Sequence, residues 1–100
     1  MMPPAINRPP LAIDQVNYTT ASAWDRQRGL LGYVSLRLNG RLRIDGMTLR
    51  RTATGRLTLS YPERRDQLGV PHPILRPIDT RTRREIEAQV FKALGLEEAR

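Results

Sequence analysis

Residues 55–86 read GRLTLSYPERRDQLGVPHPILRPIDTRTRREI, and this stretch decides the fold. Its first part alternates leucine with threonine and serine up to Tyr61, a period of two that predicts a strand with one apolar face. Pro62 ends this strand because proline cannot donate a hydrogen bond to a neighbouring strand. The three prolines between residues 71 and 77 then predict an extended crossing, since proline and the residue before it avoid the helical region.

A helix is predicted to follow the crossing. Thr82 and Glu85 have the T-x-x-E spacing of a capping box, in which the two side chains satisfy free backbone N–H groups at a helix start. We therefore expect a helix from about Arg83 to Leu94, ended by Gly95 in a left-handed conformation. The predicted apolar stripe consists of Ile86, Val90, Ala93 and Leu94, with Phe91 at its margin.

Upstream, alternating residues predict further strands. Residues 11–19 form one strand with a phase slip near Gln15, and residues 30–38 form the next. Asn39-Gly40 follows, a strong hairpin signal because both residues tolerate positive φ in a type I′ turn. The return strand changes parity at Gly46, so we expect a β-bulge at Asp45–Gly46 that restores the inward face.

Together these elements predict an α+β domain, in which an antiparallel β-meander of about four strands is covered by one C-terminal α-helix. A second tight turn is expected at residues 52–55. Residues 1–10 hold four prolines and are expected to form a flexible arm, residues 11–96 one domain, and residues 97–100 a tail.

Residues 20–29 are polar around Trp24 and predict a loop. That tryptophan has two interpretations. It is either a stacking platform for a nucleic-acid base or a hydrophobic plug where the loop meets the core, and we favour the plug as the commoner arrangement.

The charge balance favours a polyanionic partner. The 100 residues carry a net charge of +7, and 16 of the 17 basic residues are arginine. From Arg26 to Arg84 there are fourteen arginines and four acidic residues, an excess of ten positive charges. Guanidinium groups suit bidentate contacts to phosphate, so a concentrated excess of this kind points to nucleic acid.

Three arginines, Arg81, Arg83 and Arg84, open the predicted helix. A cation at a helix N-terminus is unfavourable by up to about 1 kcal/mol, and a phosphate from outside would reverse that sign. The alternative is that these arginines only form a solvated cationic surface and bind no ligand. Arg64 and Arg65 follow the last strand, and a turn separates Arg50 and Arg51 from it. The predicted nucleic-acid-binding residues are Arg50, Arg51, Arg64, Arg65, Arg81, Arg83 and Arg84.

The sequence argues against an enzyme. Cysteine is absent, which excludes disulfides and thiolate chemistry. His72 is the single histidine, and no acid in the sequence obviously orients it, so we expect a hydrogen-bonding wedge and not a catalyst. We predict no catalytic residue, no metal, no cofactor and no small-molecule substrate. Because no run approaches the roughly 18 apolar residues of a membrane span and no signal peptide is visible, we expect a cytoplasmic protein without membrane insertion.

The segments GRLTLSYPERRD, PHPI and TRTRREIEAQV, in this order, resemble the stage V sporulation protein G (SpoVG) family. In that family a strand ending in proline leads to a basic pair, an H-P-I tripeptide and a helix that opens S-T-R-x-x-I. Here the pair is Arg64-Arg65, the tripeptide begins at His72 and the helix opening begins at Thr82. The resemblance covers about residues 30–94. Extra residues before the helix, and Glu85 where the family often carries lysine, depart from the pattern.

The resemblance implies a small cytoplasmic homodimer that binds DNA or RNA and regulates septation, cell division or sporulation. Binding would fall on Arg64, Arg65, Arg83 and Arg84. Our first hypothesis is therefore a nucleic-acid-binding regulator. The alternative is a non-enzymatic protein-interaction module that docks an acidic partner in cell division.

Overall fold

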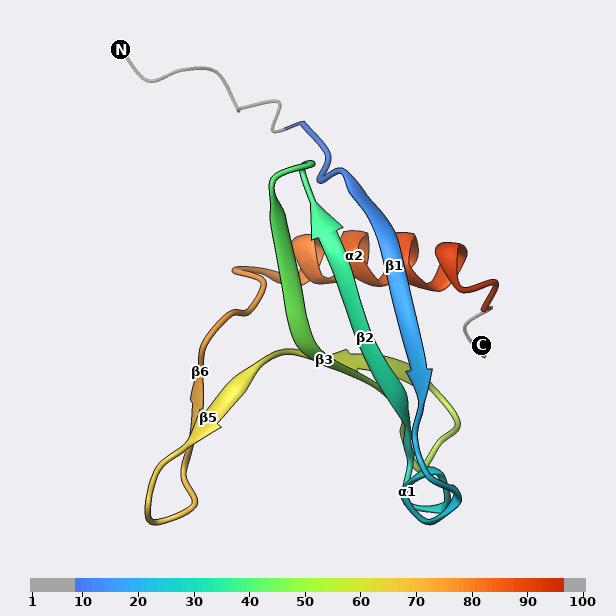
Figure 1. Ribbon diagram of the computed structural model, residues 1–100, viewed down its shortest axis with the longest axis vertical. Helices are drawn as coiled ribbons and strands as arrows, with labels where there is room; N and C mark the ends of the chain where they lie inside the picture. The colour runs from blue at the N-terminus through green and yellow to red at the C-terminus, as the bar shows by residue number, and fades with distance from the viewer. Residues whose placement is uncertain (1–8, 97–100) are drawn as a thin grey trace.

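The computed structural model describes residues 9–96, so the predicted tail and residues 1–8 of the predicted arm lie outside the described residues. Four antiparallel strands form one sheet in the order β1-β2-β3-β4, and helix α2 crosses one face of it (Figure 1). This confirms the predicted α+β meander. The bounds are β1 Ile13–Thr20, β2 Leu30–Leu38, β3 Leu42–Arg51, β4 Leu57–Ser60 and α2 Thr80–Ala93.

The core lies between the sheet and α2. Strands β2, β3 and β4 each direct alternate residues toward the helix, as their period of two predicts, and α2 closes the core from the other side. The buried apolar residues of this cluster are Val34, Leu36, Met47, Leu49, Leu57, Leu59, Val90 and Phe91.

The predicted bulge in β3 is confirmed. Between the pairs Val34–Met47 and Leu36–Ile44, β3 holds one residue more than β2. Gly46 accommodates it with a φ of 82°, a conformation that L side chains rarely adopt. The bulge keeps Met47 and Leu49 on the same face as Ile44, and so the parity change in the sequence leaves the core continuous.

The phase slip near Gln15 is a second bulge. β1 holds one residue more than β2 between the pairs Asp14–Arg37 and Asn17–Ser35, and Gln15 has a φ of 46°. The predicted hairpin between β2 and β3 is also confirmed, with positive φ at both Asn39-Gly40 positions (52° and 67°).

Helix α2 begins earlier than the sequence predicted. Its N-cap is Asp79, whose carboxylate accepts a hydrogen bond of 2.7 Å from the backbone N–H of Thr82. Thr82 therefore lies inside the first turn and is not the cap. An aspartate is the better cap here because its charge also complements the positive end of the helix dipole. The predicted end at Gly95 is confirmed, with a φ of 69°.

The buried face of α2 is rotated from the predicted stripe. Phe91, placed at the margin by the sequence, is buried, whereas Ala93 is exposed. Glu87 is also buried and retains only 9% of its exposure. A buried carboxylate needs hydrogen-bonding or ionic partners, and Glu87 has both.

Polar side chains on α2 hold both edge strands of the sheet. On one side the Glu87 carboxylate accepts from the backbone N–H of Leu59 in β4 at 3.3 Å. On the other side Gln89 accepts from the N–H of Ile13 and donates to the carbonyl of Leu11, at 3.2 and 2.7 Å. These bonds satisfy backbone groups that an edge strand leaves open.

Two elements were not predicted. Residues 20–29 contain a short helix, α1 (Ala23–Gln27), capped by Ser22. The proline-rich crossing, expected to be merely extended, folds into a second hairpin of β5 (Glu63–Arg65) and β6 (Pro71–Pro73). This hairpin projects from the β4 end of the domain, away from both the sheet and α2 (Figure 1).

Replacing Glu87 with alanine is expected to lower the free energy of unfolding by about 1–3 kcal/mol, because the Leu59 N–H then loses its acceptor in a buried position. Glu87→Gln keeps an acceptor oxygen and should cost less. Urea unfolding measures both. Equal stability of Glu87→Ala and the wild type would show that this bond does not stabilise the sheet edge.

Candidate nucleic-acid interface

The β5–β6 hairpin carries Arg64 and Arg65 on its first strand. Arg64 pairs across the ladder with His72, and its guanidinium makes no hydrogen bond or ion pair with any residue of the described range. Arg65 is partly engaged, since it donates to the Gly69 carbonyl at 2.8 Å and lies 3.6 Å from Glu63. Neighbouring residues of a strand point to opposite faces, so the basic pair is divided between the two faces of the hairpin.

Asp66 holds the hairpin turn together. Its carboxylate accepts from the backbone N–H groups of Leu68 and Val70 at 2.9 and 3.0 Å and bonds to the imidazole of His72 at 2.8 Å. The expected hydrogen-bonding role of His72 is thus present, and Asp66 is the orienting acid that the sequence did not reveal. Asp66 and His72 are six residues apart in the sequence, and their side chains meet only because the crossing folds into a hairpin.

The three arginines at the start of α2 do not share one face. Arg81 and Arg84 are three residues apart and lie on neighbouring positions of the helix surface, where neither is paired with a described carboxylate. Arg83 points to the sheet instead. Its guanidinium lies 3.9 Å from the Glu87 carboxylate and 3.4 Å from the Thr58 hydroxyl.

Arg50 and Arg51 lie at another end of the molecule. They end β3 beside the start of β2, where the Arg51 N–H donates to the Gly29 carbonyl at 2.7 Å. The Arg51 guanidinium donates to the Gly55 carbonyl across the β3–β4 turn. Figure 1 shows this end of the sheet next to α1, apart from the β5–β6 hairpin.

The structure therefore separates the seven predicted residues. The base of the hairpin and the start of α2 share a hollow of about 520 Å³ lined by Glu63, Pro73, Asp79 and Arg83, among others. The two arginines that line this hollow are Arg76 and Arg83, and Arg64, Arg81 and Arg84 lie outside it. Arg50 and Arg51 lie at a different end of the molecule and do not extend the surface at the hairpin and the helix start.

Trp24 is not the plug that we favoured. It retains 65% of its exposure, and the Arg28 guanidinium lies 4.9 Å from the centroid of its ring. Ala21 is the residue of this segment that is buried. The Trp24 side chain therefore takes no part in closing the core.

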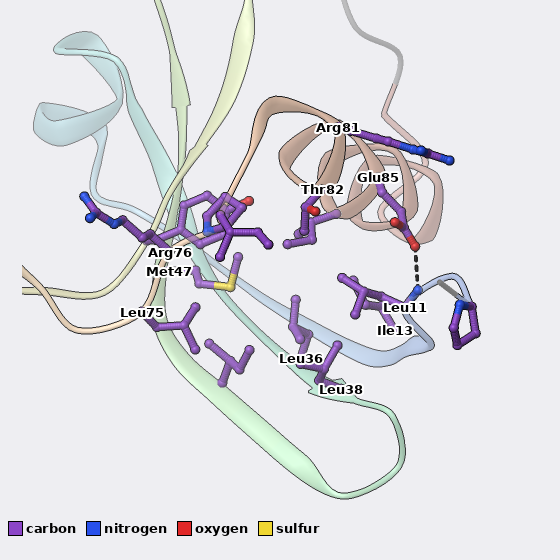
Figure 2. Close-up of a pocket in the computed structure, with 16 residues that line it drawn as sticks. Leu11, Ile13, Leu36, Leu38, Met47, Leu75, Arg76, Arg81, Thr82 and Glu85 are labelled. Atoms are coloured by element: carbon purple, nitrogen blue, oxygen red, sulfur yellow. Dashed lines mark hydrogen bonds between the residues drawn. The ribbon is translucent and has the colours of Figure 1, made fainter. Parts of the chain in front are cut away.

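A larger cavity of about 550 Å³ lies between the sheet and the first half of α2 (Figure 2). Its floor is apolar, with Leu36 and Met47 among the lining residues. Figure 2 shows the charged ends of Arg76 and Arg81 directed away from that floor, on opposite sides. Glu85 is at the rim, where its carboxylate accepts from the backbone N–H of Leu11.

Tyr61 lies between this cavity and the hollow beside the hairpin. Its hydroxyl is buried and has no hydrogen-bond partner among the described residues. Burial, together with the negative charge of Glu87, raises the pKa of Tyr61 to about 12. The phenol is therefore neutral at physiological pH.

No protein-family model matches the chain, and no curated protein matches it in sequence. Between residues 9 and 96, no helix is long and apolar enough to cross a membrane. In the same range no group of three or more His, Asp or Glu side chains could hold a metal ion.

The hairpin turn is expected to respond to acid. Hydrogen bonds from His72 and from the Val70 and Leu68 N–H groups hold the pKa of Asp66 below its ordinary value of 3.8. A lowered pKa in the folded state means that Asp66 stabilises the turn above pH 3.8 and that this contribution is lost as the pH falls through the lowered value.

We therefore expect the amide NMR signals of Leu68 and Val70 to titrate with a midpoint below pH 3.8. In Asp66→Asn this transition should disappear, and the two amides should exchange faster with solvent at neutral pH. An unchanged titration in Asp66→Asn would assign the transition to another group.

Proposed function

We propose that this protein is a nucleic-acid-binding regulator that holds the phosphate backbone of DNA or RNA through arginines, as the resemblance to the SpoVG family implies. The observation that carries the proposal is the number of guanidinium groups without an internal carboxylate partner. Arg64, Arg81 and Arg84 make no ion pair within the described part of the chain. Arginines that are buried or paired with a carboxylate would argue for a structural role, whereas these three are exposed.

The residues proposed for binding are Arg64 on the hairpin and Arg81 and Arg84 on α2, and the hollow lies between these two elements without being lined by any of the three. The hairpin projects from the domain, so it can follow a backbone that passes the start of the helix (Figure 1). Contacts of this type position a protein on nucleic acid and carry little sequence information. We therefore expect modest selectivity.

Arg83 has a separate role in this proposal. Its contacts with Glu87 and Thr58 connect α2 to β4, so its replacement would disturb the fold as well as the charge. The resemblance assigned Arg83 to binding, and we assign it mainly to positioning Glu87. Arg65 is similarly divided between the hairpin turn and solvent.

The finer parts of the proposal come from the resemblance. They are a homodimeric state, a cytoplasmic location and a regulatory part in septation or sporulation. Light scattering at micromolar concentration tests the first, and a monomer of 11.4 kDa would contradict it.

The test of binding is the salt dependence of affinity for random duplex DNA, single-stranded DNA and RNA. If about five phosphates are engaged, log affinity should fall against log salt with a slope near −4 to −5 on duplex. Arg64→Gln combined with Arg84→Gln should reduce that slope by about two and weaken binding about tenfold at 0.1 M salt, roughly as expected for two lost contacts.

A matched control removes two positive charges elsewhere. Arg41 lies in the β2–β3 turn, and Lys92 is exposed near the end of α2. Arg41→Gln combined with Lys92→Gln should leave slope and affinity nearly unchanged. An equal loss in both double variants would show that net charge, and not this surface, attracts the polyanion. No binding to any of the three nucleic acids would contradict the proposed function.

A further inference from the structure

The end of the sheet beside α1 carries a second concentration of arginine. Five arginines lie in residues 22–29 and 50–56, against Asp25 as the one acidic residue of these segments. The Asp25 carboxylate already accepts from the Ser22 hydroxyl at 3.1 Å. The five arginines are Arg26, Arg28, Arg50, Arg51 and Arg56.

Backbone hydrogen bonds hold these segments together. The carbonyl of Gly29, which follows α1, accepts from the N–H of Arg51 at 2.7 Å, and Leu30 pairs with Arg50. Across the next turn the N–H of Thr52 donates to the Arg56 carbonyl at 2.8 Å. The segments that carry these arginines, α1 and the β3–β4 turn, are therefore held side by side at one end of the sheet.

Trp24 stands on this surface, and nothing in the fold requires it there. With 65% of its surface exposed and Arg28 over one face of the ring, the indole still presents apolar area to solvent. The contact with Arg28 joins residues four apart, so it holds the ring in a defined orientation on a helix of only five residues. An exposed aromatic ring with a fixed orientation is suited to stacking.

The charges around the ring favour an anionic ligand. No described carboxylate lies within ion-pair distance of Arg26, Arg28 or Arg50, and the partner of Arg51 is the neutral Gly55 carbonyl. A ligand that offers flat apolar rings and negative charges at regular intervals matches this surface. Single-stranded nucleic acid does so, whereas a duplex keeps its base faces stacked inside.

We propose that the surface formed by Trp24, Arg28 and Arg50 binds single-stranded nucleic acid, with an unpaired base stacked on the free face of the Trp24 ring and the adjoining phosphates held by the arginines. This inference rests on the proposed function and adds a site distinct from the Arg64–Arg84 surface. It also names the class of ligand, a strand whose bases are unpaired.

The protein carries its own probe for this site, because Trp24 is its single tryptophan. Fluorescence is recorded during titration with oligo(dT), oligo(U), a duplex of equal length and an abasic strand that has phosphates without bases. Stacking should quench the emission with the two single strands, and the duplex and the abasic strand should leave it nearly unchanged. Equal quenching by the abasic strand would overturn the stacking assignment.

Trp24→Ala, followed by anisotropy of labelled strands, completes the test. Loss of one stacked base should weaken oligo(dT) binding about tenfold or more and leave duplex and abasic affinity unchanged, while Trp24→Phe should recover part of the loss. The control is Tyr33→Ala, which removes a second exposed aromatic ring (47%) from β2. Circular dichroism verifies folding, which we expect to persist because Trp24 is outside the core.

The outcomes separate the two proposals. If Trp24→Ala binds oligo(dT) as tightly as the wild type while duplex binding persists, the stacking site is wrong and the proposed function stands. If the wild type binds none of the four strands, both fail. Arg28→Ala should weaken oligo(dT) and abasic binding alike, with the salt slope reduced by about 0.7 for one lost phosphate contact; an unchanged slope would remove Arg28 from the site.

Discussion

The structure depends on the attachment of one helix to both edges of a four-stranded sheet. Glu87 bonds the backbone of β4, Gln89 bonds the backbone just ahead of and at the start of β1, and the apolar residues between them fill the core. A small domain buries a modest fraction of its surface, so satisfied edges contribute noticeably to its stability. Because Arg83 contacts Glu87 from the preceding turn, a residue that looked like a free cation in the sequence is part of this attachment.

This changes the electrostatic reasoning about the helix start. The sequence suggested that three arginines at the N-terminus of a helix are unfavourable there and that an anion from outside would offset the cost. In the structure Asp79 already supplies a carboxylate at the N-cap, and Glu87 lies opposite Arg83. Carboxylates of the protein itself therefore offset part of the positive charge at the helix start. What remains is a surplus of arginines whose guanidinium groups face solvent on two separate surfaces, and the proposals rest on that surplus.

The meander could be predicted because each of its signals is local. Alternation in β2 and β4, the Asn39-Gly40 turn and the parity change at Gly46 each follow from two to nine consecutive residues. The β5–β6 hairpin could not, since all six of its strand residues are exposed and give no apolar alternation. The spatial grouping of the candidate arginines could not be predicted for a related reason. Which arginines share a surface depends on how the hairpin and the helix are oriented, and no local pattern shows that Trp24 is exposed while the nearby Ala21 is buried.

The two bulges lie at the same level of the sheet. The extra residue of β1 is opposite Leu36 and that of β3 is opposite Ser35, so the two neighbours of β2 are irregular at adjacent positions. β2 has an irregularity of its own nearer its start, where Leu31 is extra relative to β3. Because a bulge bends its strand and increases the local twist, the shape of the sheet at this level depends on the number of residues in β1 and β3 as well as on their side chains. Deleting one residue from either neighbour would exchange the faces of the half-strand beyond it. Homologous chains with this fold should therefore conserve the spacing across these positions more strictly than the residues that occupy them.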